Sequence, residues 1–166
     1  MVVDASKSLQ LDTNNYPNYY TEEMENVIDK INEYLEKLIE TKATTEGIIF
    51  IYNLSKFITN IEDKKKIETF TKNIKKYEKI SIIIVEEPKK IKEYQYETWY
   101  TTIFGSGNGL WIGKGISDQS IIKTSGYSKE MQLPYKNDMG FSAIDGEGIL
   151  IKYIDFITKD EEEDNE

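Results

Sequence analysis

The sequence contains no cysteine, no histidine and no arginine, and all 21 of its basic residues are lysine. Without cysteine and histidine, the chain has no disulfide, thiol nucleophile, imidazole general base or Cys/His zinc site. Without arginine, it supplies no arginine finger to a phosphoryl-transfer site. The side-chain chemistry that remains for catalysis is that of carboxylates, lysine, tyrosine and hydroxyl groups.

Positive charge is also outnumbered by negative charge. The 166 residues include 30 acidic and 21 basic ones, which gives a formal net charge of −9. Six of the acidic residues lie at positions 160–166, so 24 acidic and 21 basic residues remain over 1–159, a net charge of −3. Binding along a phosphate backbone needs clustered positive charge, so nucleic acid is not an expected partner.

Long hydrophobic runs are missing as well. No stretch approaches the roughly 18 apolar residues of a membrane span, and residues 1–5 lack the charged and apolar regions of a signal peptide. Because 39% of the residues are hydrophobic, a chain of this length can bury a core. We therefore expect a cytoplasmic protein with one domain over 1–158 and an acidic, disordered tail over 159–166.

Alternating helix and strand patterns predict an α/β fold. Apolar residues at helical spacing predict helices over 21–41, 54–78 and 91–104, with Thr21 as N-cap of the first. Apolar, β-branched runs at 48–52 and 80–85 are typical of strands that are buried on both faces. Residues 1–3 are a further strand end, and residues 9–20 are predicted to form a loop. Strand–helix–strand alternation indicates a mainly parallel sheet.

The last third of the sequence has a different character. Gly105–Gly109 is predicted to be a flexible loop, and residues 110–112 and 120–124 are predicted to be short strands. Residues 139–145 and 148–154 are typical of a β-hairpin that closes at Asp145–Gly148.

The glycines near Lys114 do not match a phosphate loop. Asn108 stands where that motif has its first glycine, and Gly115 stands where it has Ser or Thr. The bulky residues 110–112 would also fill the cradle that backbone N–H groups form around phosphates. A glycine-rich connection is therefore favoured over a nucleotide site.

The strand at 48–52 has the form of a Walker B strand but lacks its acid. Tyr52 and Asn53 stand where a carboxylate should face the metal-bound water. Tyrosine keeps its proton at neutral pH, and asparagine cannot act as a general base. A plain central strand is the alternative to a degenerate Walker B-like element.

Three carboxylates follow predicted strands, namely Asp4, Glu86 and Glu87. Ligands of open α/β sheets bind outside the carboxyl ends of strands, so their position is suggestive. Solvation of a charged pair at a strand exit is the more common situation, and we do not predict a catalytic role or a metal site for them.

Aromatic residues concentrate between positions 94 and 111. Such residues beside a flexible loop are common in protein-binding surfaces, with core packing as the alternative. Helical phase places Tyr96, Trp99, Tyr100 and Ile103 on one face and Tyr94 away from it, so part of the cluster should reach the surface. The candidate protein-binding residues are Tyr94, Tyr96, Trp99, Tyr100, Phe104, Asn108 and Trp111.

The order of these pieces resembles the FtsK/SpoIIIE-type ATPase modules. It is most similar to the third, C-terminal ATPase domain of the EssC-type coupling proteins of type VIIb secretion systems. The similar segments are residues 2–9, whose strand ends in Asp, the helix at 21–41, the strands at 48–53 and 80–85, and the segments 109–119 and 134–151. The order of the segments is more specific than any one of them.

This resemblance implies a P-loop NTPase-like fold of the RecA/FtsK type. It implies a mainly parallel sheet flanked by helices and a C-terminal β-hairpin, here without the phosphate-loop part. The family's third domain is commonly degenerate, which implies substrate recognition or control rather than hydrolysis. The implied partners are secreted proteins and other domains or subunits of the coupling ATPase, including copies of this chain. The membrane would be reached only through the parent protein, and no ATP or magnesium cofactor is expected.

Two other classes of function are alternatives. A small acidic cytoplasmic binding protein, such as an immunity protein that neutralises an exported toxin, fits the charge and size equally well. A working ATPase or DNA translocase is disfavoured by the missing motifs.

Overall fold

The computed structural model describes residues 1–112, 116, 119–126, 129–132 and 139–152. The chain divides into two compact units, Met1–Gly105 and Ser106–Glu166. The domain limits of 1–158 stay a prediction, and the acidic tail at 159–166 lies outside the described residues. Of the helices that the structure describes, none is both long enough and apolar enough to cross a membrane.

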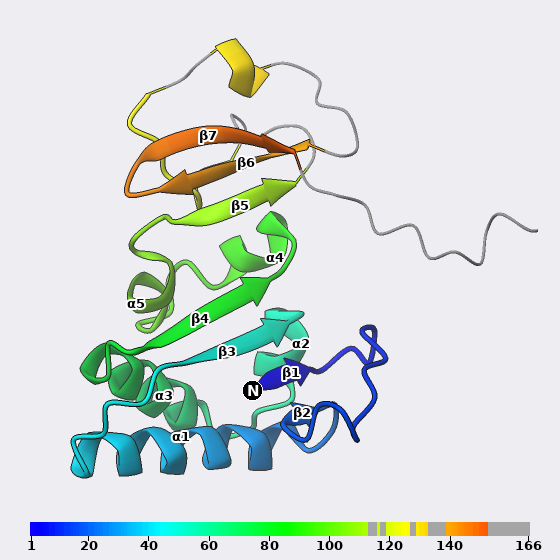
Figure 1. Ribbon diagram of the computed structural model, residues 1–166, viewed down its shortest axis with the longest axis vertical. Helices are drawn as coiled ribbons and strands as arrows, with labels where there is room; N and C mark the ends of the chain where they lie inside the picture. The colour runs from blue at the N-terminus through cyan, green and yellow to red at the C-terminus, as the bar shows by residue number, and fades with distance from the viewer. Residues whose placement is uncertain (113–115, 117–118, 127–128, 133–138, 153–166) are drawn as a thin grey trace, which may run out of the picture. The chain divides into compact units, whose positions relative to one another are not determined.

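A four-stranded parallel sheet in the order β2-β1-β3-β4 forms the centre of the first unit (Figure 1). Its strands are β1 (Val2–Asp4), β2 (Tyr19–Tyr20), β3 (Gly47–Tyr52) and β4 (Ile80–Val85). The predicted parallel α/β architecture is confirmed. The predicted loop over 9–20 is wrong at its end, because Tyr19 and Tyr20 pair with β1 as an edge strand.

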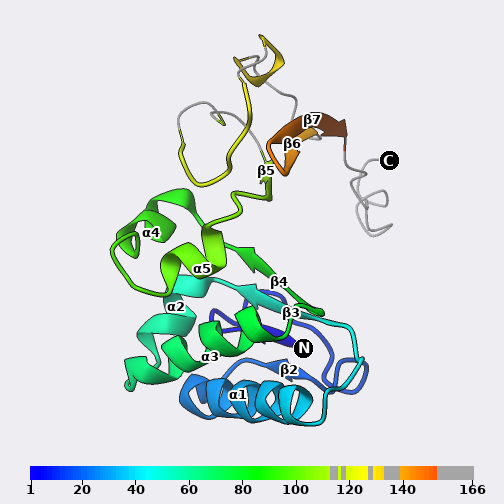
Figure 2. The same cartoon turned by 90° about the vertical axis from the view of Figure 1, so that its left-hand side faces the viewer.

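Helices α1 (Met24–Glu40) and α3 (Lys64–Lys76) pack against each other on one face of this sheet (Figure 2). The apolar side chains that recur at helical spacing on each helix form the inner stripe. They close a single core with the inward side chains of β1 and β3. The fully buried members of this core include Val3, Ile28, Ile31, Leu35, Ile51 and Ile61.

The opposite face of the sheet is not covered in the same way. In β3 and β4, Ile49 and Ile51 point into the core, whereas Ile48, Ile83 and Val85 are 54%, 43% and 41% exposed. The prediction that both strands are buried on both faces is therefore wrong. A continuous apolar run indicates that both faces of a strand carry apolar side chains. It does not indicate that other parts of the protein pack against both faces.

The predicted helix over 54–78 is two helices, α2 (Leu54–Thr59) and α3. The interruption has a clear cause, because the Asp63 side chain accepts a hydrogen bond from Lys65 N at 3.0 Å and caps α3. The first helix begins at Met24 and not after Thr21. Its N-cap residue is Glu23, in the left-handed region with φ of 52°, and no side chain caps the helix.

The predicted helix over 91–104 is also two pieces, α4 (Pro88–Glu93) and α5 (Tyr100–Phe104). Turns over 94–99 separate them. The apolar periodicity of the segment therefore comes from aromatic residues that pack from a turn, which a helical template cannot distinguish from a helix face.

The second unit contains an antiparallel sheet in the order β5-β6-β7. Its strands are β5 (Gly109–Ile112), β6 (Met139–Ile144) and β7 (Glu147–Lys152), and a short 3-10 helix, η2, spans Lys129–Gln132. The predicted hairpin is confirmed. Asp145 and Gly146 have φ of 51° and 83°, as a two-residue hairpin turn of type I′ requires.

Residues 120–124 do not form the predicted strand and contribute one isolated bridge, between Thr124 and Gly146. Among the described residues of the second unit, Ile116, Met131 and Phe141 form a buried apolar cluster, with Trp111 packed against it. Buried side chains are close-packed, so the stability of this unit should be sensitive to a change in volume within the cluster.

We predict that Gly148→Ala destabilises the second unit by about 1–3 kcal/mol, the usual cost of overpacking. An added Cβ would lie 2.2 Å from Cε1 of the fully buried Phe141. Faster amide hydrogen exchange in β6 and β7, with no change in β3, is the expected readout. Gly126→Ala is the control because nothing lies within 4 Å of its added Cβ. Equal exchange rates in both variants would contradict the packing described here.

Candidate functional site at the carboxyl edge of the parallel sheet

Three strands of the parallel sheet end at one edge. Asp4, Tyr52 and Val85 share a register across β1, β3 and β4, so the residues that follow them meet there. In parallel α/β folds this edge is where ligands bind and where catalytic side chains are placed. Sequence reasoning therefore selected the correct edge for Asp4, Asn53 and Glu86.

The Asp4 carboxylate is completely buried and accepts four hydrogen bonds. The donors are Leu9 N at 2.8 Å, the Tyr19 hydroxyl at 3.0 Å, and Ser6 through both its N–H at 3.1 Å and its hydroxyl at 2.7 Å. These bonds bring the chain after β1 back onto the sheet and attach it to β2. The carboxylate therefore works as an internal tether for residues 5–9 and 19.

The pKa of Asp4 reflects two opposing effects. Burial raises the pKa, and the hydrogen bonds from Leu9, Ser6 and Tyr19 lower it, with a net result below the usual value. Burial and the neighbouring Asp4 carboxylate in turn raise the pKa of the Tyr19 hydroxyl. Asp4 is therefore ionised, and Tyr19 is protonated, at neutral pH.

The Walker B-like position of the sequence falls at the end of β3. Asn53 follows Tyr52 and adopts the left-handed conformation, with φ of 61°. Its Oδ1 accepts from Lys56 N at 3.2 Å and caps α2, while its own N–H donates to Val85 O at 2.9 Å. Asn53 thus turns the chain from strand to helix, and its side-chain oxygen serves as the N-cap of α2.

Glu86 is the residue whose burial sequence reasoning missed. Its side chain is almost fully buried, and its two oxygens accept from Ser55 N and from Glu87 N, both at 2.8 Å. Glu87 is exposed and lies 3.4 Å from the Lys90 ammonium group. The interpretation of a solvated pair is right for Glu87 and wrong for Glu86. Glu86 is buried because the fold brings Ser55, which lies 31 residues earlier, to the end of β4, where its N–H binds the Glu86 carboxylate.

These residues do not fit a magnesium–nucleotide group. Asp4 and Glu86 already use their carboxylate oxygens for backbone and side-chain donors of the same chain. Within the part of the chain that the structure describes, no three acidic side chains are grouped as metal ligands. Gly113, Lys114 and Gly115 lie outside the described residues.

The aromatic candidates of the first unit separate into buried and exposed residues. Trp99 belongs to the core, and ring centroids link it to Tyr94 at 5.5 Å and to Tyr100 at 6.5 Å. Phe104 continues the row, 5.0 Å from Tyr100. Tyr96 is 90% exposed. The prediction that Tyr96 and Trp99 share a face is wrong, because both lie in the turns between α4 and α5.

The two remaining candidates belong to the second unit. Trp111 packs against its core, and Asn108 exchanges hydrogen bonds with Asp145. Asp145 N donates to Asn108 Oδ1 at 2.8 Å, and Asn108 Nδ2 donates to Asp145 Oδ1 at 3.4 Å. The seven candidates are thus divided between two units, and their role in protein binding stays a prediction.

We predict that Asp4→Asn lowers the free energy of unfolding by about 2–3 kcal/mol at pH 7, because an amide cannot accept all four bonds. The lowered pKa means that the contribution of Asp4 is present above its unfolded-state pKa and is lost as the pH falls through the folded-state pKa. Denaturant unfolding should therefore show that the wild-type protein and Asp4→Asn differ less in free energy of unfolding in acid than at pH 7.

Asp12→Asn is the matched control for this variant. Asp12 is exposed in the same connection and accepts from Asn14 N, a bond that asparagine can also accept, and from Asn15 Nδ2, a bond that is exposed to solvent. Its replacement should change stability by less than about 0.5 kcal/mol. An Asp4→Asn protein as stable as this control would contradict the tether.

Comparison with known proteins finds solved structures that have a similar fold. No protein-family model and no curated protein matches the chain. Among solved structures, a cytoplasmic domain of EssC matches with a TM-score of 0.64 at 10% identity, over 92% of this chain and 32% of that one. EssC ATPases 2 and 3 from Geobacillus thermodenitrificans match with a TM-score of 0.67 at 9% identity, over 92% of this chain and 30% of that one. The chain spans about a third of the length of these structures and has the α/β fold of EssC ATPase domains, as the family resemblance predicted.

Proposed function

We propose that this chain acts as a non-hydrolytic domain of a type VII secretion coupling ATPase, in substrate recognition or regulation. Its fold is that of domains in EssC, which supports the assignment to a coupling protein. One observation supports the absence of hydrolysis: the polar side chains at the carboxyl edge of the sheet already bond to groups of the same chain. Asp4 and Glu86 hold loops, and Asn53 caps a helix, where an ATPase would present metal-binding and catalytic groups.

The proposal requires contact with other proteins, and the first unit offers a surface for it. Ile48, Ile83 and Val85 are exposed on the face of the parallel sheet opposite the core. Parallel sheets are normally covered on both faces, and exposed apolar patches commonly mark protein contacts. In the EssC structures the matching stretch is joined to about twice its length of further protein. We assign this sheet face to contact with another domain or subunit of the coupling ATPase, on the cytoplasmic side of the membrane.

The first test concerns nucleotide. Titration calorimetry of the whole chain with ATP and magnesium should show no saturable heat, because Asp4 and Glu86 already accept hydrogen bonds from the chain itself. An active ATPase domain of a coupling protein, titrated in the same buffer, is the positive control. Saturable binding at micromolar affinity would contradict the proposal and favour a working ATPase.

The second test concerns the exposed sheet face. The double variant Ile48→Lys/Ile83→Lys should weaken capture of the coupling ATPase at least about tenfold, since lysine on this face opposes apolar burial. Tyr34→Lys is the matched control, because Tyr34 is a similarly exposed apolar residue on α1. Undiminished capture by a folded double variant would contradict this surface. Co-purification with an exported toxin, and not with the ATPase, would favour the immunity-protein alternative.

A further inference from the structure

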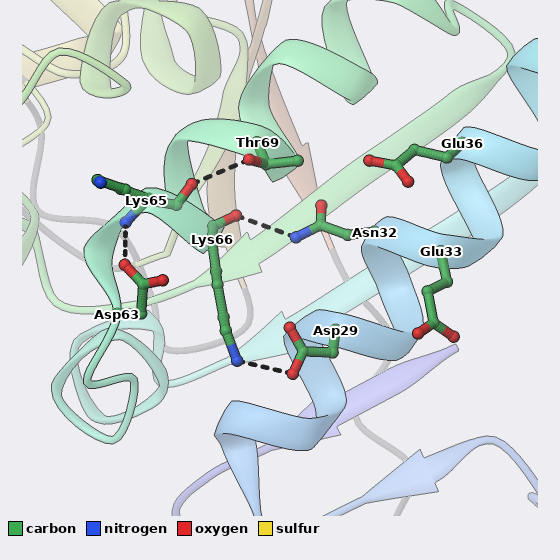
Figure 3. A pocket seen from close by; sticks show the side chains of 8 residues that line it. All are labelled: Asp29, Asn32, Glu33, Glu36, Asp63, Lys65, Lys66 and Thr69. Carbon is green, nitrogen blue, oxygen red and sulfur yellow. Dashed lines mark hydrogen bonds and ion pairs between the residues drawn. The ribbon is translucent and has the colours of Figure 1, made fainter.

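A polar groove lies between α1 and α3, away from the carboxyl edge of the sheet (Figure 3). Its volume is about 340 Å³. Four carboxylates and two ammonium groups line it, which leaves a net charge of −2. The lining residues with these charges are Asp29, Glu33, Glu36, Asp63, Lys65 and Lys66. The groove is thus a negatively charged concavity formed by two rigid helices.

Asn32 is the unusual residue of this groove. The residue is buried, with 7% of its surface exposed, and its Nδ2 donates to Lys66 O at 3.1 Å. The Oδ1 atom has no hydrogen-bond partner. Figure 3 shows this oxygen directed away from Lys66, toward the space between Thr69 and Glu36. A buried amide oxygen without a donor is uncommon in folded proteins, and Asn32 Oδ1 therefore keeps the capacity to accept a hydrogen bond from another molecule.

Two of the groove's acids are already used by the protein. Lys66 Nζ lies 2.7 Å from Asp29 and 2.6 Å from Glu25, and these hydrogen bonds raise the pKa of Lys66 to about 12. Asp63 caps α3 through Lys65 N. The Asp29 charge is therefore balanced by Lys66, whereas Asp63 keeps its charge and uses one oxygen to cap α3.

Glu33 and Glu36 are the acids that remain. Within the described residues, Glu36 accepts one long bond from Asn73 Nδ2 at 3.4 Å, and no bond or ion pair engages the Glu33 carboxylate. Both residues are exposed, and Glu36 lies one helical turn after Asn32 on α1. Together with Asn32 Oδ1, they form a set made only of hydrogen-bond acceptors along one stripe of α1.

A metal ion is not the ligand that this set favours, since no three acidic side chains of the described residues are placed as metal ligands. A guanidinium group fits better. Its planar fork donates two bonds to a carboxylate and retains further N–H groups for an amide oxygen. It is also more weakly hydrated than an ammonium group and loses less on entering a groove. The chain itself contains no arginine, so the group has to come from another molecule.

We propose that the groove between α1 and α3 binds an arginine side chain of a partner protein. Glu33 and Glu36 hold the guanidinium group, and Asn32 Oδ1 accepts one of its remaining N–H bonds. This site is separate from the exposed face of the sheet, and it does not depend on the function proposed above.

Nuclear magnetic resonance of the labelled chain tests the site directly. Titration with N-acetyl-arginine amide at constant ionic strength should give saturable shifts of the Asn32 side-chain amide, with a dissociation constant of about 1–10 mM. N-acetyl-lysine amide should bind at least about fivefold more weakly, because an ammonium group lacks the planar fork. Saturable binding without a preference for the arginine analogue would overturn the proposal. Shifts that do not saturate would also overturn it, and water would then be the donor to Asn32 Oδ1.

Variants identify the residues that carry binding. Glu36→Gln and Glu33→Gln should each weaken the arginine analogue by about fivefold or more, since each replaces a charge-assisted bond by a neutral one. Glu40→Gln removes the same charge from the same helix outside the groove and should change affinity by less than about twofold. An equal loss in all three variants would show a general charge effect and would overturn the site.

Discussion

The burial of one ionised carboxylate constrains much of the first unit. Asp4 is charged and inaccessible to water, so it is tolerated only because four donors surround it. Those donors come from the chain after β1 and from β2, which fixes the edge of the sheet where ligands of this fold bind. Glu86 repeats the arrangement between β4 and α2. At both positions a buried carboxylate thus holds a neighbouring segment of the same chain, while the buried Ser55 hydroxyl beside Glu86 has no partner among the described residues.

Sequence reasoning recovered the elements whose pattern is local. The strands at 48–52 and 80–85 and the hairpin at Asp145–Gly146 are present, because apolar runs and an Asp-Gly turn act over a few residues. It failed where a local pattern has two explanations. The aromatic period over 91–104 comes from a turn that packs Trp99 inward, and the apolar run in β4 leaves Ile83 and Val85 exposed.

The site was less predictable than the fold, since it depends on contacts between distant residues. Asp4 and Glu86 were correctly placed at strand ends, but their burial depends on Tyr19 and Ser55, which no spacing rule relates to them. The same is true of Asn32, an ordinary polar residue in a helix pattern. Its unpartnered oxygen follows from the way α3 crosses α1. Such features arise from packing and have no sequence signature.

The most direct test of the claim that this edge is structural is the titration of Asp4 itself. Carbon-13 spectra of its carboxyl group, recorded against pH with and without ATP and magnesium, report both its charge and any ligand. The structure predicts a midpoint below the usual aspartate value that nucleotide leaves unchanged. A normal or raised midpoint, or a shift of the Asp4 signal on addition of magnesium and ATP, would contradict it.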